Sequence, residues 1–140
     1  MCERSSNVTS VPALNAIGIV STDLSASIRF YGLLGVAFPA PDGDHVEATL
    51  PNGLRLMLDG LTLVKELDKD WTEPKGHRMG LAFECGSPAE VDAVHAKVSA
   101  AGYASKTAPW DAFWGQRYAQ VIDPDGNVVD LFAALPAQSA

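Results

Sequence analysis

The fold is decided by a stretch that occurs twice, first as Pro51-Asn52-Gly53-Leu54-Arg55-Leu56-Met57-Leu58 and 73 residues later as Pro124-Asp125-Gly126-Asn127-Val128-Val129-Asp130-Leu131. Each copy begins with a turn built on Pro and Gly and continues into a run that favours a β-strand. A repeat at this spacing indicates that one supersecondary unit occurs twice in the chain.

The residues before the first copy predict one strand, one helix and two further strands. Asp23 is the expected N-cap of the helix, and Gly35 ends it. Together with the strand after the turn, the expected elements follow the order βαβββ and lie at residues 17–20, 24–31, 36–38, 46–50 and 54–58.

The second half predicts the same order of elements. Ser87 and Pro88 begin its helix, Gly102 ends it, and its strands are expected at residues 81–85, 103–106, 116–122 and 127–132. Aligning the first strands instead places Ala16 opposite Gly80, a shift of 64 residues. The second half therefore contains nine additional residues, which we place around 109–115.

The two units predict a single α+β domain. One βαβββ unit cannot bury its apolar face alone, so two units are expected to form a curved, eight-stranded half-barrel with both helices outside. We expect the domain over residues 13–134, with modules at 13–60 and 77–134 and a polar connection at 61–76 that can hold a helical turn around Lys65–Trp71. Residues 1–12 and 135–140 are expected to be tails, the first of them disordered.

This duplicated pattern resembles the vicinal oxygen chelate superfamily, which includes glyoxalase I, extradiol dioxygenases and the bleomycin-, fosfomycin- and mitomycin-binding resistance proteins. The strongest marker is Asp123-Pro124-Asp125-Gly126-Asn127, in register with the rest of the pattern. The other segments that carry the resemblance are residues 17–20, 23–24, 30–31, 34–36, 81–84, 102–103 and 114–117. The resemblance is closest to the metal-independent, bleomycin-resistance-like members.

In metal-dependent members of this superfamily, four side chains of the concave face hold one divalent ion. The resemblance assigns those four positions here to Ala16, Met57, Gly80 and Asp130. Alanine and glycine have no donor atom and a thioether is a poor ligand for such ions, so Asp130 alone could coordinate. We therefore expect no metal or other cofactor, and a set made of His45, His77 and Asp130 is a weak alternative.

The strand period of two predicts which side chains line the concave face. This set includes the charged Arg55, Asp59, Glu84 and Asp130, among small and apolar residues such as Met57 and Phe132. Arg55, Glu84 and Asp130 are candidates to orient a ligand, and Met57 and Phe132 to contact it. Alternatively, Arg55 pairs with Glu84 or Asp130 and fills a redundant metal cavity, Met57 is packing, and Asp130 caps a backbone group.

Three aromatic residues, Trp110, Phe113 and Trp114, fall in the additional segment of the second half. We expect them in a loop, as a stacking wall for an aromatic ligand, to which Trp71 could add. The antibiotic-binding members have comparable Pro-Trp and Trp-Gly loops beside their ligand crevice. The alternative is that the cluster closes the barrel end or forms a dimer contact.

Composition narrows the partners and the location. The net charge of −7 disfavours nucleic acid, and no run of apolar residues is long enough to span a membrane. Without a secretory signal, and with Cys2 and Cys85 not expected to form a disulfide, we predict a cytoplasmic protein. The resemblance implies a homodimer.

The leading functional hypothesis is a metal-independent protein that binds a small, partly aromatic organic molecule. Antibiotics are among the candidate ligands. The alternative is a glyoxalase- or dioxygenase-like lyase or isomerase with displaced metal ligands, for which Glu84 and Asp130 are weak catalytic candidates. A third reading is a protein without a ligand, whose concave face is filled by its own side chains.

Overall fold

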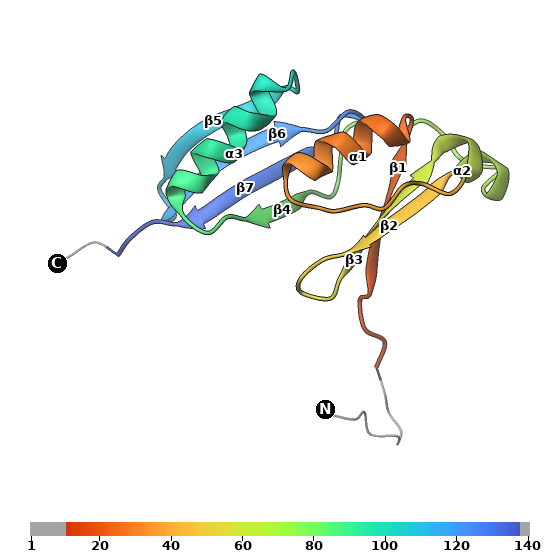
Figure 1. Ribbon diagram of the computed structural model, residues 1–140, viewed down its shortest axis with the longest axis horizontal. Coiled ribbons are helices and arrows are strands. Elements are labelled where there is room, and N and C mark those ends of the chain that lie inside the picture. The colour runs from red at the N-terminus through yellow and green to blue at the C-terminus, as the bar shows by residue number, and fades with distance from the viewer. Residues whose placement is uncertain (1–10, 138–140) are drawn as a thin grey trace.

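The computed structural model describes residues 11–137 (Figure 1). Its elements, in chain order, are β1 (Ala16–Ser21), α1 (Leu24–Leu33), β2 (His45–Thr49), β3 (Arg55–Gly60), α2 (Leu61–Leu67), β4 (Leu81–Glu84), α3 (Pro88–Ala100), β5 (Ser105–Ala112), β6 (Gln116–Ile122) and β7 (Val128–Ala134). The helix of the connection is α2, which follows β3 directly. Residues 1–10 and 138–140 lie outside the described residues, and with them Cys2, most of the expected N-terminal tail and half of the expected C-terminal tail.

The strands form two sheets, one for each module. Sheet A has the strand order β1-β3-β2 and sheet B the order β4-β7-β6-β5. In each sheet the first strand of the module runs parallel to its last strand, and all other pairs are antiparallel. The prediction of an α+β fold with two βαβββ-like modules is confirmed to that extent.

The predicted curved, eight-stranded half-barrel is wrong. The described residues form sheets of three and four strands, because residues 36–38 do not form a strand. Val36 instead packs into the core, and its backbone N–H donates to the carbonyl of Tyr31 at the end of α1. Pro39 and Pro41 follow, and proline has no N–H to donate to a ladder.

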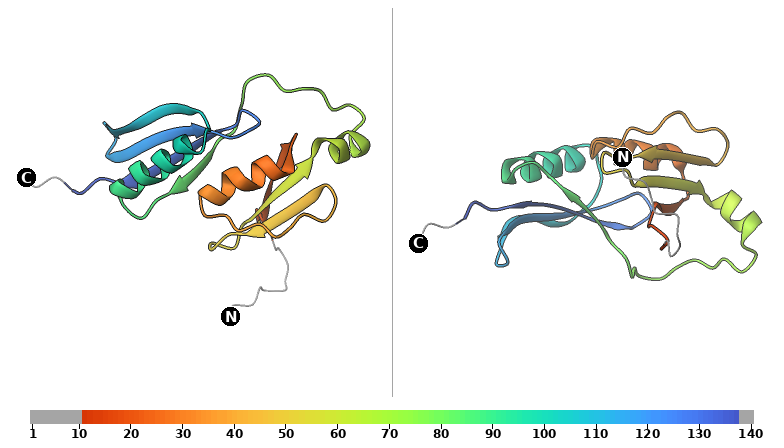
Figure 2. Two further views of the ribbon diagram at one scale, coloured as in Figure 1. Left: turned by 45° about the horizontal axis from the view of Figure 1, so that its top comes forward. Right: turned by 90° about the horizontal axis from the view of Figure 1, so that it is seen from below.

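Both long helices begin as their caps predict. The Asp23 side chain accepts a hydrogen bond from the backbone N–H of Ala26, and Ser87 Oγ accepts one from that of Glu90. The two helices lie on the same side of the molecule, α1 over sheet A and α3 over sheet B (Figure 2). The strand residues that face them are buried, which confirms the alternation; among them are Leu56, Leu58, Val129 and Leu131.

A buried carboxylate ties the second module to the first. Asp123 accepts hydrogen bonds from the phenol of Tyr31 at 2.7 Å and from the backbone N–H groups of Asp125 and Asn127 at 2.9 and 2.8 Å. Burial, and then the Asp123 charge, raise the pKa of Tyr31 far above its usual range. The turn 123–127 is therefore both a β-turn and the contact that positions α1 against sheet B.

Candidate functional site

Each sheet has one face covered by a helix and one face without a helix, which we call its open face. On β3, Leu56 and Leu58 are buried under α1, whereas Arg55, Met57 and Asp59 alternate with them and are half-buried. On β7, Asp130 and Phe132 alternate with the buried Val129, Leu131 and Ala133 in the same way. These open faces carry most of the residues predicted to contact a ligand.

A row of aromatic side chains crosses the open face of sheet B. The register aligns Trp110 of β5 with Tyr118 of β6, Tyr118 with Phe132 of β7, and Phe132 with Glu84 of β4. Residues in register on neighbouring strands share a face. The structure therefore brings together three of the predicted contact residues, with Tyr118 between two of them.

Trp114 extends this row from the β5–β6 turn. Its ring lies edge-to-face at 5.6 Å from Trp110 and 5.2 Å from Tyr118, and its indole N–H donates to Gln116 Oε1 at 2.8 Å. Trp110 is 38% exposed, Trp114 47% and Phe113 89%. The cluster is an accessible aromatic surface that is already held in place by its own contacts.

The expectation of an aromatic loop needs one correction. Trp110 belongs to β5, which ends at Ala112 and pairs with β6. The additional residues of the second half lengthen this hairpin, so only two of the three aromatic residues, Phe113 and Trp114, stand in its turn.

Asp130 lies beside the aromatic row, with its carboxylate held by two neighbours. The phenol of Tyr118 donates to it at 2.7 Å and the Gln120 amide at 2.9 Å. Burial, followed by the hydrogen bond to Asp130, raises the pKa of Tyr118 to about 12. Asp130 is aligned with Ala82 of β4, a residue with a small side chain. The alternative in which Asp130 caps a backbone group is not what the structure shows.

The open face of sheet A is polar rather than aromatic. Arg55 donates to Glu47 Oε2 at 2.8 Å and to Asn15 Oδ1 at 2.9 and 2.7 Å. The alternative pairing of Arg55 with Glu84 or Asp130 is therefore wrong, because those carboxylates belong to sheet B.

His45 is a residue of this face that the sequence did not place there. It is the first residue of β2, opposite Asp59, and its ring nitrogens lie 2.6 Å from Asp59 Oδ1 and 3.0 Å from Glu47 Oε1. These two hydrogen bonds, the one with Asp59 first, raise the pKa of His45 above 6.5. The spacing of two between His45 and Glu47 was the available signal that both share a strand face.

The positions that hold a metal in related proteins do not fit one here. Ala16 is aligned with Arg55, and Met57 with Gly18 on one side and Glu47 on the other. The Glu47 carboxylate is the one donor group among these neighbours, and it is engaged by Arg55 and His45. Within residues 11–137, no three His, Cys, Asp or Glu side chains gather as metal ligands. The alternative set of His45, His77 and Asp130 is not assembled, and His45 is engaged by its two carboxylates.

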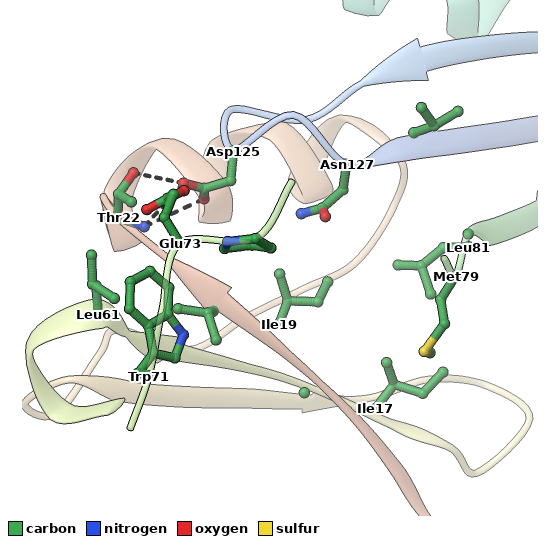
Figure 3. Close-up of a pocket in the computed structure, with 15 residues that line it drawn as sticks. Ile17, Ile19, Thr22, Leu61, Trp71, Glu73, Met79, Leu81, Asp125 and Asn127 are labelled. Atoms are coloured by element: carbon green, nitrogen blue, oxygen red, sulfur yellow. Dashed lines mark hydrogen bonds between the residues drawn. The ribbon is translucent and has the colours of Figure 1, made fainter. Parts of the chain in front are cut away.

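Two hollows lie beside β1, and the predicted contact residues line them poorly. One, between β1 and the segment leading into β4, is shown in Figure 3; of the residues expected to contact a ligand it contains only Trp71, which therefore does not join the aromatic row. The other lies near the end of α1 and includes Glu84. Cys85 is no candidate nucleophile, because burial and then the charges of Glu90 and Glu84 raise its pKa.

A family model matches residues 13–131, and its description is Glyoxalase/Bleomycin resistance protein/Dioxygenase superfamily. The chain belongs to this superfamily. Its name covers enzymes and binding proteins alike, so membership does not by itself choose between them. Within the described residues, no helix has the length and apolar character that crossing a membrane requires.

Solved structures of this superfamily have the same fold. A glyoxalase/bleomycin resistance protein/dioxygenase from Nocardioides is 28% identical, with a TM-score of 0.72 over 95% of this chain and 93% of its own. A family enzyme from Burkholderia phytofirmans PsJN is 20% identical, with a TM-score of 0.79 over 89% of this chain and 100% of its own. A glyoxalase-related enzyme from Fulvimarina pelagi is 23% identical, with a TM-score of 0.78 over 88% of each chain. No curated protein matches the chain.

Proposed function

We propose that this superfamily member is a metal-independent, bleomycin-resistance-like protein that binds a partly aromatic organic molecule on the open face of sheet B. One observation carries the proposal: the row Trp110–Tyr118–Phe132, extended by Trp114, is accessible and adjoins a fixed carboxylate. Antibiotics with planar ring systems are among the candidate ligands.

The aromatic row supplies affinity and Asp130 supplies orientation. Each ring-on-ring contact adds about 0.5–1.5 kcal/mol beyond the area it buries. Asp130 is already fixed by Tyr118 and Gln120, so it can accept a hydrogen bond from a ligand N–H or O–H without first being ordered. Glu84 is exposed at the end of the row, so its carboxylate can accept a hydrogen bond from a second donor group of the ligand.

A homodimer completes this proposal. The open face of one chain covers only one side of a flat ligand, and the 89% exposed Phe113 side chain is an apolar group that a second copy could cover. A crevice at or near the subunit interface would also give Arg55 and Met57 a route to the ligand. Sedimentation at micromolar concentration tests the dimer directly.

Tryptophan fluorescence tests the binding proposal. Trp110 and Trp114 should report a saturable change when the right member of a panel of aromatic metabolites and antibiotics is added. Trp114→Leu should weaken binding by about tenfold through the loss of stacking. Trp71 lies outside the row, so the control variant Trp71→Phe should leave binding unchanged. A panel without any saturable change would favour the reading in which the protein has no ligand.

The second candidate is a glyoxalase- or dioxygenase-like lyase or isomerase without the usual metal ligands. His45 favours it, because a histidine held between Asp59 and Glu47 can hold a proton on the open face of sheet A. Asp130 and Glu84 stay the carboxylate candidates on sheet B. Turnover that Asp130→Asn abolishes, with the fold retained by circular dichroism, would replace the binding proposal by this one.

A further inference from the structure

A cavity of about 280 Å³ lies at the seam between the two modules (Figure 3). β1 forms one wall, the residues leading into β4 form the other, and Trp71 and Pro74 of the connection also line it. The cavity is separate from the aromatic row, because its lining residue Val128 is four residues before Phe132 on β7, or about 13 Å along the strand.

The charged groups of the cavity have one sign. Asp125 and Glu73 line it together with the neutral side chains of Thr22 and Asn127, and none of its lining residues is Lys, Arg or His. Thr22 donates to Asp125 through its hydroxyl at 2.6 Å and its backbone N–H at 3.2 Å. Both donors are neutral, and within residues 11–137 no salt bridge involves Asp125 or Glu73.

The rest of the cavity is mostly apolar, with its carboxylates at one end. Figure 3 shows Asp125 and Glu73 near Trp71, and Ile17 and Leu81 toward the other end. Lys65 Nζ lies 5.5 Å from the centroid of the Trp71 ring, a cation–π contact that holds the indole against α2. An apolar hollow with a few convergent polar groups is the usual form of a small-molecule site.

We propose that this seam cavity binds a small organic ammonium ion, with its charged end beside Asp125 and Glu73 and its apolar end between Ile17 and Leu81. A neutral ligand would leave both carboxylates without a cation, and an anion would be repelled by them. A bare metal ion would leave the apolar lining unused. The cavity volume of about 280 Å³ lies at the lower end of the range for small-molecule pockets, so the ligand should be small.

Benzylamine and its neutral isostere benzyl alcohol test the proposal, by calorimetry and by nuclear magnetic resonance. Benzylamine should saturate the site and shift the amide signals of Gly18 and Gly80 and the indole signal of Trp71. Benzyl alcohol should bind about tenfold more weakly, because it lacks the charge. Equal binding of the two, or no saturation by benzylamine at millimolar concentration, would overturn the proposal.

Variants locate the charge effect. Glu73→Gln combined with Asp125→Asn should weaken benzylamine by about tenfold, and the new Asn side chain keeps an oxygen that Thr22 can donate to. The control is Glu66→Gln, which removes one negative charge from an exposed side chain of α2 outside the cavity. It should leave benzylamine binding unchanged. If the double variant unfolds, Glu73→Gln alone serves, because Glu73 is exposed. Signals that shift only at Trp110 and Trp114 would place the amine on sheet B and refute the seam site.

Discussion

The open faces of sheets A and B differ, although the two modules share one pattern. Sheet A presents a chain of polar contacts that runs from Asp59 through His45, Glu47 and Arg55 to Asn15. Sheet B presents a row of aromatic rings beside one held carboxylate. The repeat therefore preserved the scaffold and let the two faces diverge.

Positions related by the shift of 73 residues show where the modules stayed alike. Leu56 and Leu58 correspond to Val129 and Leu131, and all four are buried under a helix. On the open face, Met57 corresponds to Asp130 and Asp59 to Phe132. Close packing constrains the covered positions, whereas an open position can change its chemistry without disturbing the fold.

The largest expected effect tests this contrast between covered and open positions. Leu131→Ala should lower the free energy of unfolding by about 2–5 kcal/mol, because it leaves a cavity beneath α3. Phe132→Ala, the next residue, should cost clearly less because its side chain is half-exposed. Urea denaturation measures both, and equal losses would show that the open face is as tightly packed as the covered one.

A smaller loss of stability is expected from breaking the Tyr31–Asp123 hydrogen bond, and it tests whether this contact couples the two modules. Tyr31→Phe removes a donor from the buried Asp123 carboxylate and should cost about 1–3 kcal/mol. Because Asp123 belongs to the β6–β7 turn and accepts from Tyr31 of α1, amide signals should shift in both modules. Tyr103→Phe is the matched control, since it removes a phenol that is only half-buried. Shifts confined to one module would show that Asp123 does not couple them.

The smallest effect concerns the polar face alone. The Asp59 and Glu47 hydrogen bonds raise the pKa of His45 above 6.5, so the protonated form is favoured in the folded protein. The stability from this contact is therefore complete below pH 6.5 and is lost as the pH rises through the folded-state pKa.

A nuclear magnetic resonance titration of the His45 ring checks this shift. Asp59→Asn should move the His45 pKa back toward 6.5, because it removes the first of the two causes. Unfolding measured at pH 6 and pH 9 should show a difference for the parent protein that the variant reduces. A His45 pKa at or below 6.5 in the parent would contradict the hydrogen-bonded geometry.

Several features of the site could be predicted because they depend on local order. Period-two alternation placed Arg55, Met57, Asp130 and Phe132 on open faces, since successive side chains of a strand point to opposite sides. The partners of these residues could not be predicted, because a hydrogen bond between strands depends on register. Arg55 thus has Glu47 and Asn15 rather than a carboxylate of the other module.

The residues alone were enough to establish the two-module order, the helix caps, the apolar faces under the helices and the lack of donor atoms at Ala16 and Gly80. These properties follow from residue type and from spacing of a few positions. Three other outcomes emerged only in the folded chain: Val36 joins the core instead of an eighth strand, Trp110 aligns with Tyr118, and Asp125 and Glu73 line one cavity. Those outcomes depend on how segments far apart in the chain pack, and local pattern carries no information about that.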